Sequence, residues 1–330
     1  MPMSAKEEKS ESPANCNSKR AMGWLPDPPD FRDYSETHPE IDGIIVEGIK
    51  SEKIKAGRHS KDRNAPLPFS RTFAASDLPP SVDLRSYCSP VEDQANLGSC
   101  TAHAGVGLIE YYERRSFGRH VDASRLFLYK VTRNLMKLKG DSGAYLRTTM
   151  GAMVLFGVPP ESYWPYTDKE ESFDREPSAF CYAFAQNYQT IKYFRHDPAG
   201  SKPPDVLHSL KAYLAKGMPF IFGFSVYNSI EQAEETGFIP FPSSRERMEG
   251  GHAVMAVGYD DKLEITNNFS HEKTKGALLI RNSWGTGWGD HGYGWLPYEY
   301  VLRGLAEDFW SILKKEWVDT SAFSSGGHGL

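Results

Sequence analysis

The chain has 330 residues, of which 39% are hydrophobic and 25% charged, a composition typical of a globular protein with room for two lobes. A formal net charge of −5 excludes the strongly basic class of nucleic-acid-binding proteins, so we expect no nucleic-acid partner. No apolar run approaches the roughly 18 residues of a membrane-spanning helix, so we expect no membrane partner either.

The N-terminus is polar and lacks the apolar core of a signal peptide, which favours a cytoplasmic protein or one exported by another route. Four cysteines, Cys16, Cys88, Cys100 and Cys181, are too few for a disulfide scaffold, and the pattern leaves open whether Cys88 and Cys181 pair. The cysteines show no CxxC spacing and the histidines no HExxH motif, so we expect no metal and no cofactor.

The first 77 residues differ in composition from the rest. Residues 1–22 are dominated by Ser, Glu, Lys and Asn, which predicts disorder. The stretch GWLPDPPDFRDY at 23–34 can lie extended against a surface at low entropic cost, because proline fixes φ beforehand. A short strand is predicted at 42–50 and an exposed basic stretch at 51–64. We place the start of the globular body near residue 78.

The first half of the body is predicted to be helical. Small and apolar side chains favour a helix at 100–117, where Gly105 and Gly107 indicate close approach to another element. Two further helices are predicted at 122–138, with Asp122 and Ser124 as candidate caps, and at 145–156.

Beyond about residue 186 the pattern is that of an antiparallel β structure. One helix is predicted at 205–217, and the last residues, 319–330, are rich in Gly and Ser and favour a flexible tail. The predicted strands lie at 189–195, 220–227, 252–261, 276–284 and 292–301.

Cys100, in the stretch LGSCTAHAG at 97–105, is the candidate nucleophile. The reactive form is the thiolate, and a free cysteine has a pKa near 8.5, so a nucleophilic cysteine needs activation. The predicted helix begins at Cys100, which would place the positive end of the helix dipole on its sulfur. Taken alone, this residue also fits a buried structural cysteine.

Two other segments supply candidate partners. His252 follows two glycines at the start of a predicted strand, although a histidine that merely begins a strand is the alternative. Asn282 lies in IRNSWGTGWGDHGYGW, and its amide oxygen can accept a hydrogen bond from the distal nitrogen of a histidine. Trp284 and Trp288 can shield that bond from water, or they can simply fill the core of a glycine-rich hairpin. Gln94 can offer its side-chain NH₂ to a developing oxyanion beside the backbone N–H of the cysteine.

These segments resemble the papain-like cysteine peptidases: Gln94, GSC at 98–100, GHAVMAVGY at 251–259 and NSWGTGWGDHGYG at 282–294. The resemblance runs from about residue 78 to 317, and GYGWLPYEYVL at 292–302 points to the bacterial branch. It implies an α+β fold with a helical left lobe at 78–185, a β-rich right lobe at 186–318 and the active-site cleft between them.

The implied activity is that of a cysteine endopeptidase acting on a peptide or protein substrate. A Cys100–His252 thiolate–imidazolium pair attacks the peptide bond, Asn282 orients His252, and Gln94 completes the catalytic set. The resemblance also implies that the backbone of Gly143 and Ala144 pairs with substrate. An apolar pocket for the side chain two residues before the cleaved bond is expected to involve Leu146, Gly251 and Ala253. Trp284 is expected as a further substrate-binding residue.

The chain departs from the family pattern beside the nucleophile. Leu97 stands where a cysteine is usual, so the customary disulfide cannot form, and Thr101 replaces an aromatic residue. Neither change removes a catalytic group.

Residues 1–77 do not match the long helical prosegment of the plant and animal enzymes. We nevertheless expect them to form a prosegment that crosses the cleft as extended chain and inhibits it from within the molecule, with LPDPPDF at 25–31 and APLPFS at 65–70 as blocking pieces. An unstructured leader is the alternative. For the whole chain, the alternatives are an inactive binding module and a thiol acyltransferase or amidase on the same scaffold. We expect a monomer.

Overall fold

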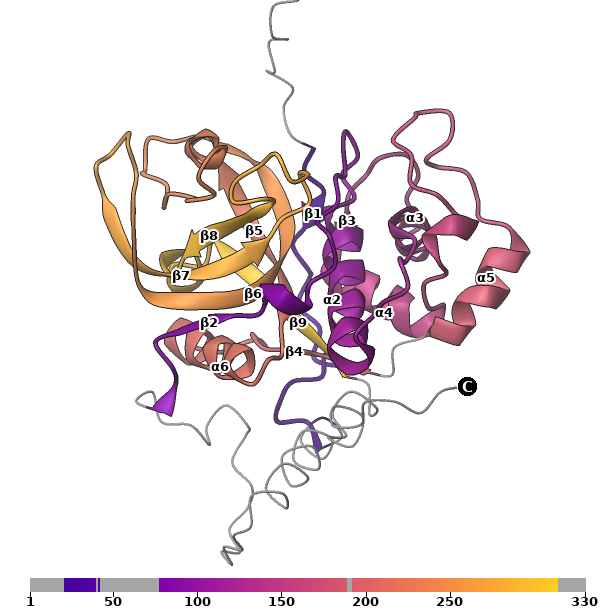
Figure 1. The fold of residues 1–330 in the computed structure, drawn as a ribbon, viewed down its shortest axis with the longest axis horizontal. Helices are drawn as coiled ribbons and strands as arrows, with labels where there is room; N and C mark the ends of the chain where they lie inside the picture. The colour runs from indigo at the N-terminus through magenta and orange to yellow at the C-terminus, as the bar shows by residue number, and fades with distance from the viewer. Residues whose placement is uncertain (1–20, 40, 42–76, 189–191, 314–330) are drawn as a thin grey trace, which may run out of the picture.

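A computed structural model describes residues 21–39, 41, 77–188 and 192–313 of the chain (Figure 1). The predicted strand at 42–50, the basic stretch at 51–64, the blocking piece at 65–70 and the tail at 319–330 lie outside the described residues, as does the predicted disorder of 1–20.

One half of the molecule is helical. Helix α2 spans Cys100–Phe117, which confirms the predicted bounds, and α3 (Arg125–Leu135) and α4 (Leu146–Leu155) lie inside their predicted ranges. Ser124, not Asp122, caps α3, because its side-chain oxygen accepts a hydrogen bond from the Phe127 backbone N–H at 3.1 Å. The sequence pattern missed α5 (Ala179–Ala185), a short helix in which the aromatic Phe180 is exposed and obscures the apolar face.

The other half is an antiparallel sheet, with α6 (Pro203–Ala215) beside it (Figure 1). Strand β2 (Ser81–Asp83) pairs with β6, so the body begins on the sheet rather than among the helices. The remaining strands, in spatial order, are β4 (Lys192–Arg195), β9 (Ala306–Leu313), β5 (Phe220–Tyr227), β6 (Met248–Thr266), β7 (Lys273–Arg281) and β8 (Tyr293–Pro297).

The C-terminal end of the sheet differs from the prediction. The strand expected at 292–301 ends at Pro297, which has no N–H to donate to a ladder, and α7 (Glu299–Leu302) follows it. Strand β9 was not predicted, because Glu307 and Asp308 interrupt its apolar run.

Helix α2 lies between the other helices and the sheet, and its glycines permit this position (Figure 1). A Cβ atom at Gly107 would lie 2.4 Å from Nη1 of Arg281 on β7, and one at Gly105 would lie 3.0 Å from Sδ of Met153 on α4. Both glycines therefore serve the close approach that the sequence predicted. The packing holds the first residue of α2 at the junction of the two halves.

No helix in the described part of the chain is long and apolar enough to cross a membrane. In the same residues, no group of three or more His, Cys, Asp or Glu side chains could hold a metal ion.

We expect Gly107→Ala to lower the free energy of unfolding by about 1–3 kcal/mol, because the new methyl group overlaps Arg281. The matched control is Gly151→Ala in α4, where the nearest atom to a Cβ is the Tyr193 hydroxyl at 3.7 Å. That change should raise the same free energy by up to about 1 kcal/mol through helix propensity. Urea denaturation measures the free energy of unfolding of each variant. Changes of the same sign in the two variants would contradict this account.

Candidate active site

Cys100 is the first residue of α2 and its side chain is completely buried. Backbone groups of Ala253, Gly23 and Thr101 contact its sulfur. Burial raises the pKa of the thiol to about 11, and these backbone contacts only partly oppose the rise. In the arrangement described here, the thiol is therefore neutral at pH 7.

His252 lies on β6, directly before the Ala253 that contacts the sulfur. Its Nε2 is 2.7 Å from Oδ1 of Asn282, and because that oxygen can only accept, Nε2 carries the hydrogen. Nδ1 has no hydrogen-bond partner in the described residues, which leaves it available to take a proton. Burial lowers the pKa of the imidazole to about 4, against the opposing effect of Asn282.

Asn282 is held from two sides. Its Oδ1 also accepts from the Ser283 backbone N–H at 2.8 Å. The Trp284 ring stacks on the imidazole of His252, with ring centroids 4.5 Å apart and planes 25° apart, and Trp288 meets Trp284 edge-on. Both tryptophans are almost fully buried, so this packing shields one face of the His252–Asn282 hydrogen bond from water.

Gln94 is oriented by the residue that follows Asn282. Ser283 Oγ donates to Gln94 Oε1 at 2.5 Å, and the Gln94 backbone N–H donates to the Ser283 carbonyl at 2.8 Å. The side-chain NH₂ therefore points the other way, where it donates to the carbonyl oxygens of Leu97 at 2.8 Å and Ala21 at 3.1 Å. Gln94 thus presents a donor to a peptide carbonyl.

The two departures beside Cys100 are both buried. Leu97 packs with Leu126 and Phe173 in a small apolar cluster, and Thr101 lies in the first turn of α2. Cys88 and Cys181 are each buried and free, so the structure does not pair them.

Residues 21–34, which we call the N-terminal segment, lie across this site between the two halves of the molecule (Figure 1). Strand β1 (Trp24–Leu25) pairs in parallel with β3 (Ala144–Tyr145), and the Gly23 carbonyl accepts from the Ala144 N–H at 2.7 Å. Gly23 also approaches Gly143 so closely that a Cβ there would lie 2.4 Å from the Gly23 oxygen. The backbone predicted to pair with substrate pairs here with the chain's own N-terminal segment.

The Trp24 side chain fills a deep space beside β5 and β6. Cβ atoms at Gly223 and Gly251 would overlap the residue, at 1.9 Å from its indole Cε2 and at 2.6 Å from its carbonyl oxygen. The indole Nε1 donates to Oδ2 of Asp308 at 3.2 Å. Of these residues, only Gly251 was predicted to line a substrate pocket, and the apolar character of that pocket stays a prediction. Gly223 was not singled out from the sequence, although a glycine inside an apolar strand is a signal that could have identified it.

Leu146 and Ala253 are the other residues predicted for that pocket. Leu146, the first residue of α4, is completely buried, and Ala253 is 1% exposed. Both belong to the same apolar core cluster as Trp24.

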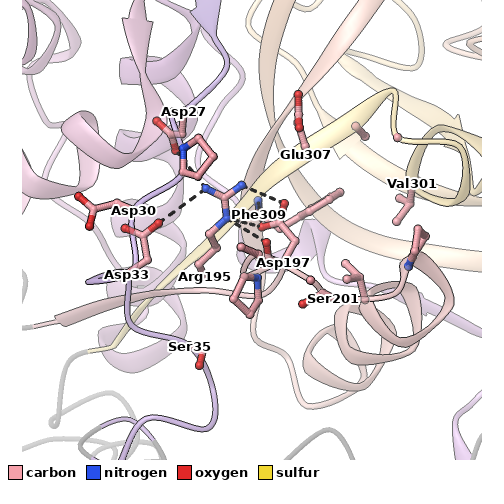
Figure 2. A pocket seen from close by; sticks show the side chains of 18 of the residues that line it. Asp27, Asp30, Asp33, Ser35, Arg195, Asp197, Ser201, Val301, Glu307 and Phe309 are labelled. Carbon is pink, nitrogen blue, oxygen red and sulfur yellow. Dashed lines mark hydrogen bonds and ion pairs between the residues drawn. The ribbon is translucent and has the colours of Figure 1, made fainter.

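A buried charge cluster fixes the next part of the N-terminal segment (Figure 2). Asp27 accepts from Trp310 Nε1 at 2.9 Å and from the Arg147 backbone N–H at 3.2 Å, while its own N–H donates to Asp308 at 2.8 Å. Burial, with the nearby Asp308 carboxylate, raises the pKa of Asp27 above its usual range. Arg147 also binds Asp33 with two hydrogen bonds.

Arg195, on β4, joins the cluster to the body of the protein. Its guanidinium contacts Asp308 at 2.6 Å and Asp197 at 3.0 Å, and its backbone N–H donates to the Tyr34 carbonyl at 2.7 Å. The group borders a pocket of about 770 Å³ between the N-terminal segment and β9 (Figure 2). Sequence reasoning missed this cluster, because its members are dispersed over more than 280 residues.

Residues 78–307 match the model of the papain family of cysteine proteases. The chain belongs to this family, and it is a cysteine peptidase with the papain-like α+β fold that the sequence predicted.

Individual relatives agree with this assignment. Xylellain, a cysteine protease from Xylella fastidiosa, superposes with a TM-score of 0.65 at 34% identity, over 89% of this chain and 97% of that one. An uncharacterised peptidase C1-like protein of Acanthamoeba polyphaga mimivirus is 35% identical over 72% of this chain and 73% of its own length. Cathepsin K of Gallus gallus is 28% identical over 70% of this chain and 63% of its own length.

The covered site predicts slow alkylation of Cys100. Both Cys100 and His252 are neutral at pH 7 in the structure described, so iodoacetamide should modify Cys100 more slowly than a free cysteine. Trp24→Ala removes a buried indole, which should weaken the packing of the N-terminal segment by about 3–5 kcal/mol. Cys100 should then be more accessible and react faster with iodoacetamide at pH 7. Peptide mapping by mass spectrometry measures the rate of alkylation at each cysteine. Cys88 and Cys181 are internal controls whose rates should not change, and equal rates for Cys100 in both proteins would contradict the prediction.

Proposed function

We propose that the protein is a cysteine endopeptidase made as a zymogen, in which Cys100 and His252 form the reactive pair and the N-terminal segment blocks the site. The observation that carries the proposal is a peptide carbonyl, that of Ala21, bound by Gln94 beside the buried Cys100. This carbonyl supports the proposal because Gln94 donates to it as it would to a substrate carbonyl.

The proposed reaction begins with transfer of the Cys100 proton to Nδ1 of His252. The thiolate attacks the carbonyl carbon of the substrate, and the developing oxyanion accepts from Gln94 Nε2 and the Cys100 backbone N–H. One such donor is typically worth roughly 2.7–4 kcal/mol of barrier. His252 then protonates the leaving amine, and water hydrolyses the thioester while Asn282 keeps the imidazole oriented.

We propose that substrate uses the groove now filled by the N-terminal segment. The Gly143 and Ala144 backbone would pair with the peptide, since Ala144 already donates to Gly23. Leu146, Gly251 and Ala253 would surround a side-chain pocket. A substrate contact of Trp284 stays a prediction. Its ring stacks on His252 and the residue is 4% exposed, so little of it can reach a substrate.

The contacts of the N-terminal segment favour an inhibitory role over that of an unstructured leader. Its backbone pairs with β3, its Trp24 is buried, and its Asp27 and Asp33 accept hydrogen bonds from Arg147. While it stays in place, burial holds Cys100 and His252 in their neutral forms. The inactive-module alternative would be favoured by the loss of a catalytic group, and all four are present. A thiol acyltransferase would use the same groups and differ only in its acceptor.

We expect full-length Trp24→Ala to hydrolyse a fluorogenic peptide faster than the unchanged chain, because the loosened segment uncovers Cys100. Adding Cys100→Ser should then reduce turnover by about three orders of magnitude or more. Circular dichroism of each variant checks the fold. A folded Cys100→Ser variant that keeps a tenth of the activity would refute the assigned nucleophile, and unchanged activity in folded Trp24→Ala would refute the block.

Binding of the N-terminal segment should weaken as the pH rises. Asp27 has a raised pKa when docked but an ordinary one near 3.9 in a free peptide, so docking retains a proton that the free peptide loses. A synthetic peptide of residues 21–39 should therefore inhibit the Trp24→Ala enzyme more strongly at pH 5 than at pH 8. The same peptide carrying Asp27→Asn is the control and should show a flatter pH dependence. Identical profiles for the two peptides would contradict the role of Asp27.

A further inference from the structure

Behind the active site, a row of hydrogen bonds connects the first turn of α2 to Gln94. Tyr166, which lies between α4 and α5, places its hydroxyl 2.8 Å from the Gln94 backbone carbonyl and 2.7 Å from Oγ of Ser99. Ser99 directly precedes Cys100, and Nδ1 of His103 lies 3.3 Å from the same Oγ. None of these three side chains has a part in the proposed reaction, yet they end on the residue that offers its NH₂ group to the oxyanion.

The direction of each hydrogen bond in this row is fixed. A carbonyl oxygen only accepts, so the Tyr166 hydroxyl gives its one hydrogen to Gln94, and Ser99 Oγ must donate to Tyr166. His103 Nδ1 faces the Ser99 carbonyl as well, at 3.1 Å, and therefore carries a hydrogen. Burial lowers the pKa of His103 to about 3, so the ring is neutral and that hydrogen is its single one. All the bonds point toward Gln94, and hydrogen bonds aligned in this way strengthen one another.

The backbone beside Gln94 needs such a contact. Ala95 has a φ of 48°, in the left-handed region that residues other than glycine seldom adopt. The Ala95 N–H donates to Oδ1 of Asp93 at 2.8 Å, but Asp93 is exposed to solvent. The Gln94 carbonyl accepts from the Leu97 N–H at 3.2 Å and from the Tyr166 hydroxyl. Tyr166 thus holds the peptide unit from which the Gln94 side chain is aimed.

The Tyr166 ring is itself held in place. It packs against the apolar cluster of Leu97, Leu126 and Phe173, and it meets the His103 ring edge-on, with centroids 5.1 Å apart. Burial raises the pKa of Tyr166 above its usual range, so its hydroxyl keeps the hydrogen that it donates. A fixed ring and a fixed hydrogen make this hydroxyl a rigid donor.

We propose that Tyr166 is a positioning residue for the reaction, which aims the NH₂ group of Gln94 at the oxyanion by holding the Gln94 carbonyl. The inference rests on the proposed peptidase function and adds to it a residue that touches no substrate. A donor that is aimed less well should stabilise the transition state less and leave substrate binding unchanged, because the oxygen carries its full charge only as the reaction proceeds.

The first test compares Tyr166→Phe with its parent, the full-length Trp24→Ala enzyme. We expect kcat for a fluorogenic peptide to fall about three- to tenfold at unchanged KM, less than on loss of the donor itself. Affinity for a peptide aldehyde, which adds to Cys100 and places an oxygen where the oxyanion develops, should fall by the same factor. Inactivation by a peptidyl epoxide, which forms no such oxyanion, should change less than about twofold.

Tyr111→Phe in the same parent is the matched control. It also removes a buried hydroxyl that donates to a backbone carbonyl, that of Gly217 at 2.9 Å, but on a later turn of α2 than Cys100. Its kcat and KM should stay close to those of the parent. Equal losses of aldehyde affinity and epoxide reactivity in Tyr166→Phe, or no loss of either, would overturn the inference.

A double-mutant cycle tests whether Tyr166 acts through Gln94. Gln94→Ala alone should lower kcat by about a hundredfold. Adding Tyr166→Phe to that variant should change kcat less than about twofold, because the group that Tyr166 positions is gone. Effects of the two substitutions that multiply would overturn the inference.

Ser99→Ala provides a second route to the same result if Tyr166→Phe does not fold, as judged by circular dichroism. It removes the hydrogen bond that directs the Tyr166 hydroxyl toward Gln94, and it should lower aldehyde affinity more than epoxide reactivity. Equal changes in the two would overturn the inference alone. If the parent cleaves no peptide and its Cys100 does not react with the epoxide, the proposed function fails and this inference fails with it.

Discussion

The packing of α2 against the sheet is the contact on which the active site depends. Cys100 is on the helix and His252 is on β6, so the two come together only where these elements meet. The distance between the elements is set by Gly107 against Arg281, whose guanidinium is in turn fixed by the Pro90 carbonyl and Ser89. Any change that moves the helix by the width of a methyl group also moves the sulfur.

Ser283 links the two polar parts of the site through a single residue. Its backbone N–H donates to the oxygen of Asn282 that accepts from His252, and its hydroxyl donates to Gln94. The residue that holds the histidine and the residue that offers the NH₂ group are therefore not independent. A disturbance at either one is transmitted to the other over a few covalent bonds.

The sequence predicted the local parts of this structure well, because helix and strand periodicity depend on neighbouring residues. Helix α2 and β5 have the expected bounds, and Cys100, His252, Asn282 and Gln94 lie together. The Asp308 environment could not be predicted in the same way. Its partners Trp24, Asp27 and Arg195 are 284, 281 and 113 residues away, and no periodic pattern relates such positions. Strand β9 was missed for a local reason, because Glu307 and Asp308 interrupt its apolar run.

The N-terminal segment is covalently joined to the body that it covers, through residues 35–80 of the chain. A tethered ligand rebinds at an effective concentration that can reach about the millimolar range, so even modest intrinsic affinity keeps it bound. Cutting that connection leaves every contact in the groove unchanged and alters only the entropy of rebinding. The same residues would then act as a diffusible ligand, which dilution removes, and the concentration of cut chains in a sample would set the fraction of grooves that stay filled.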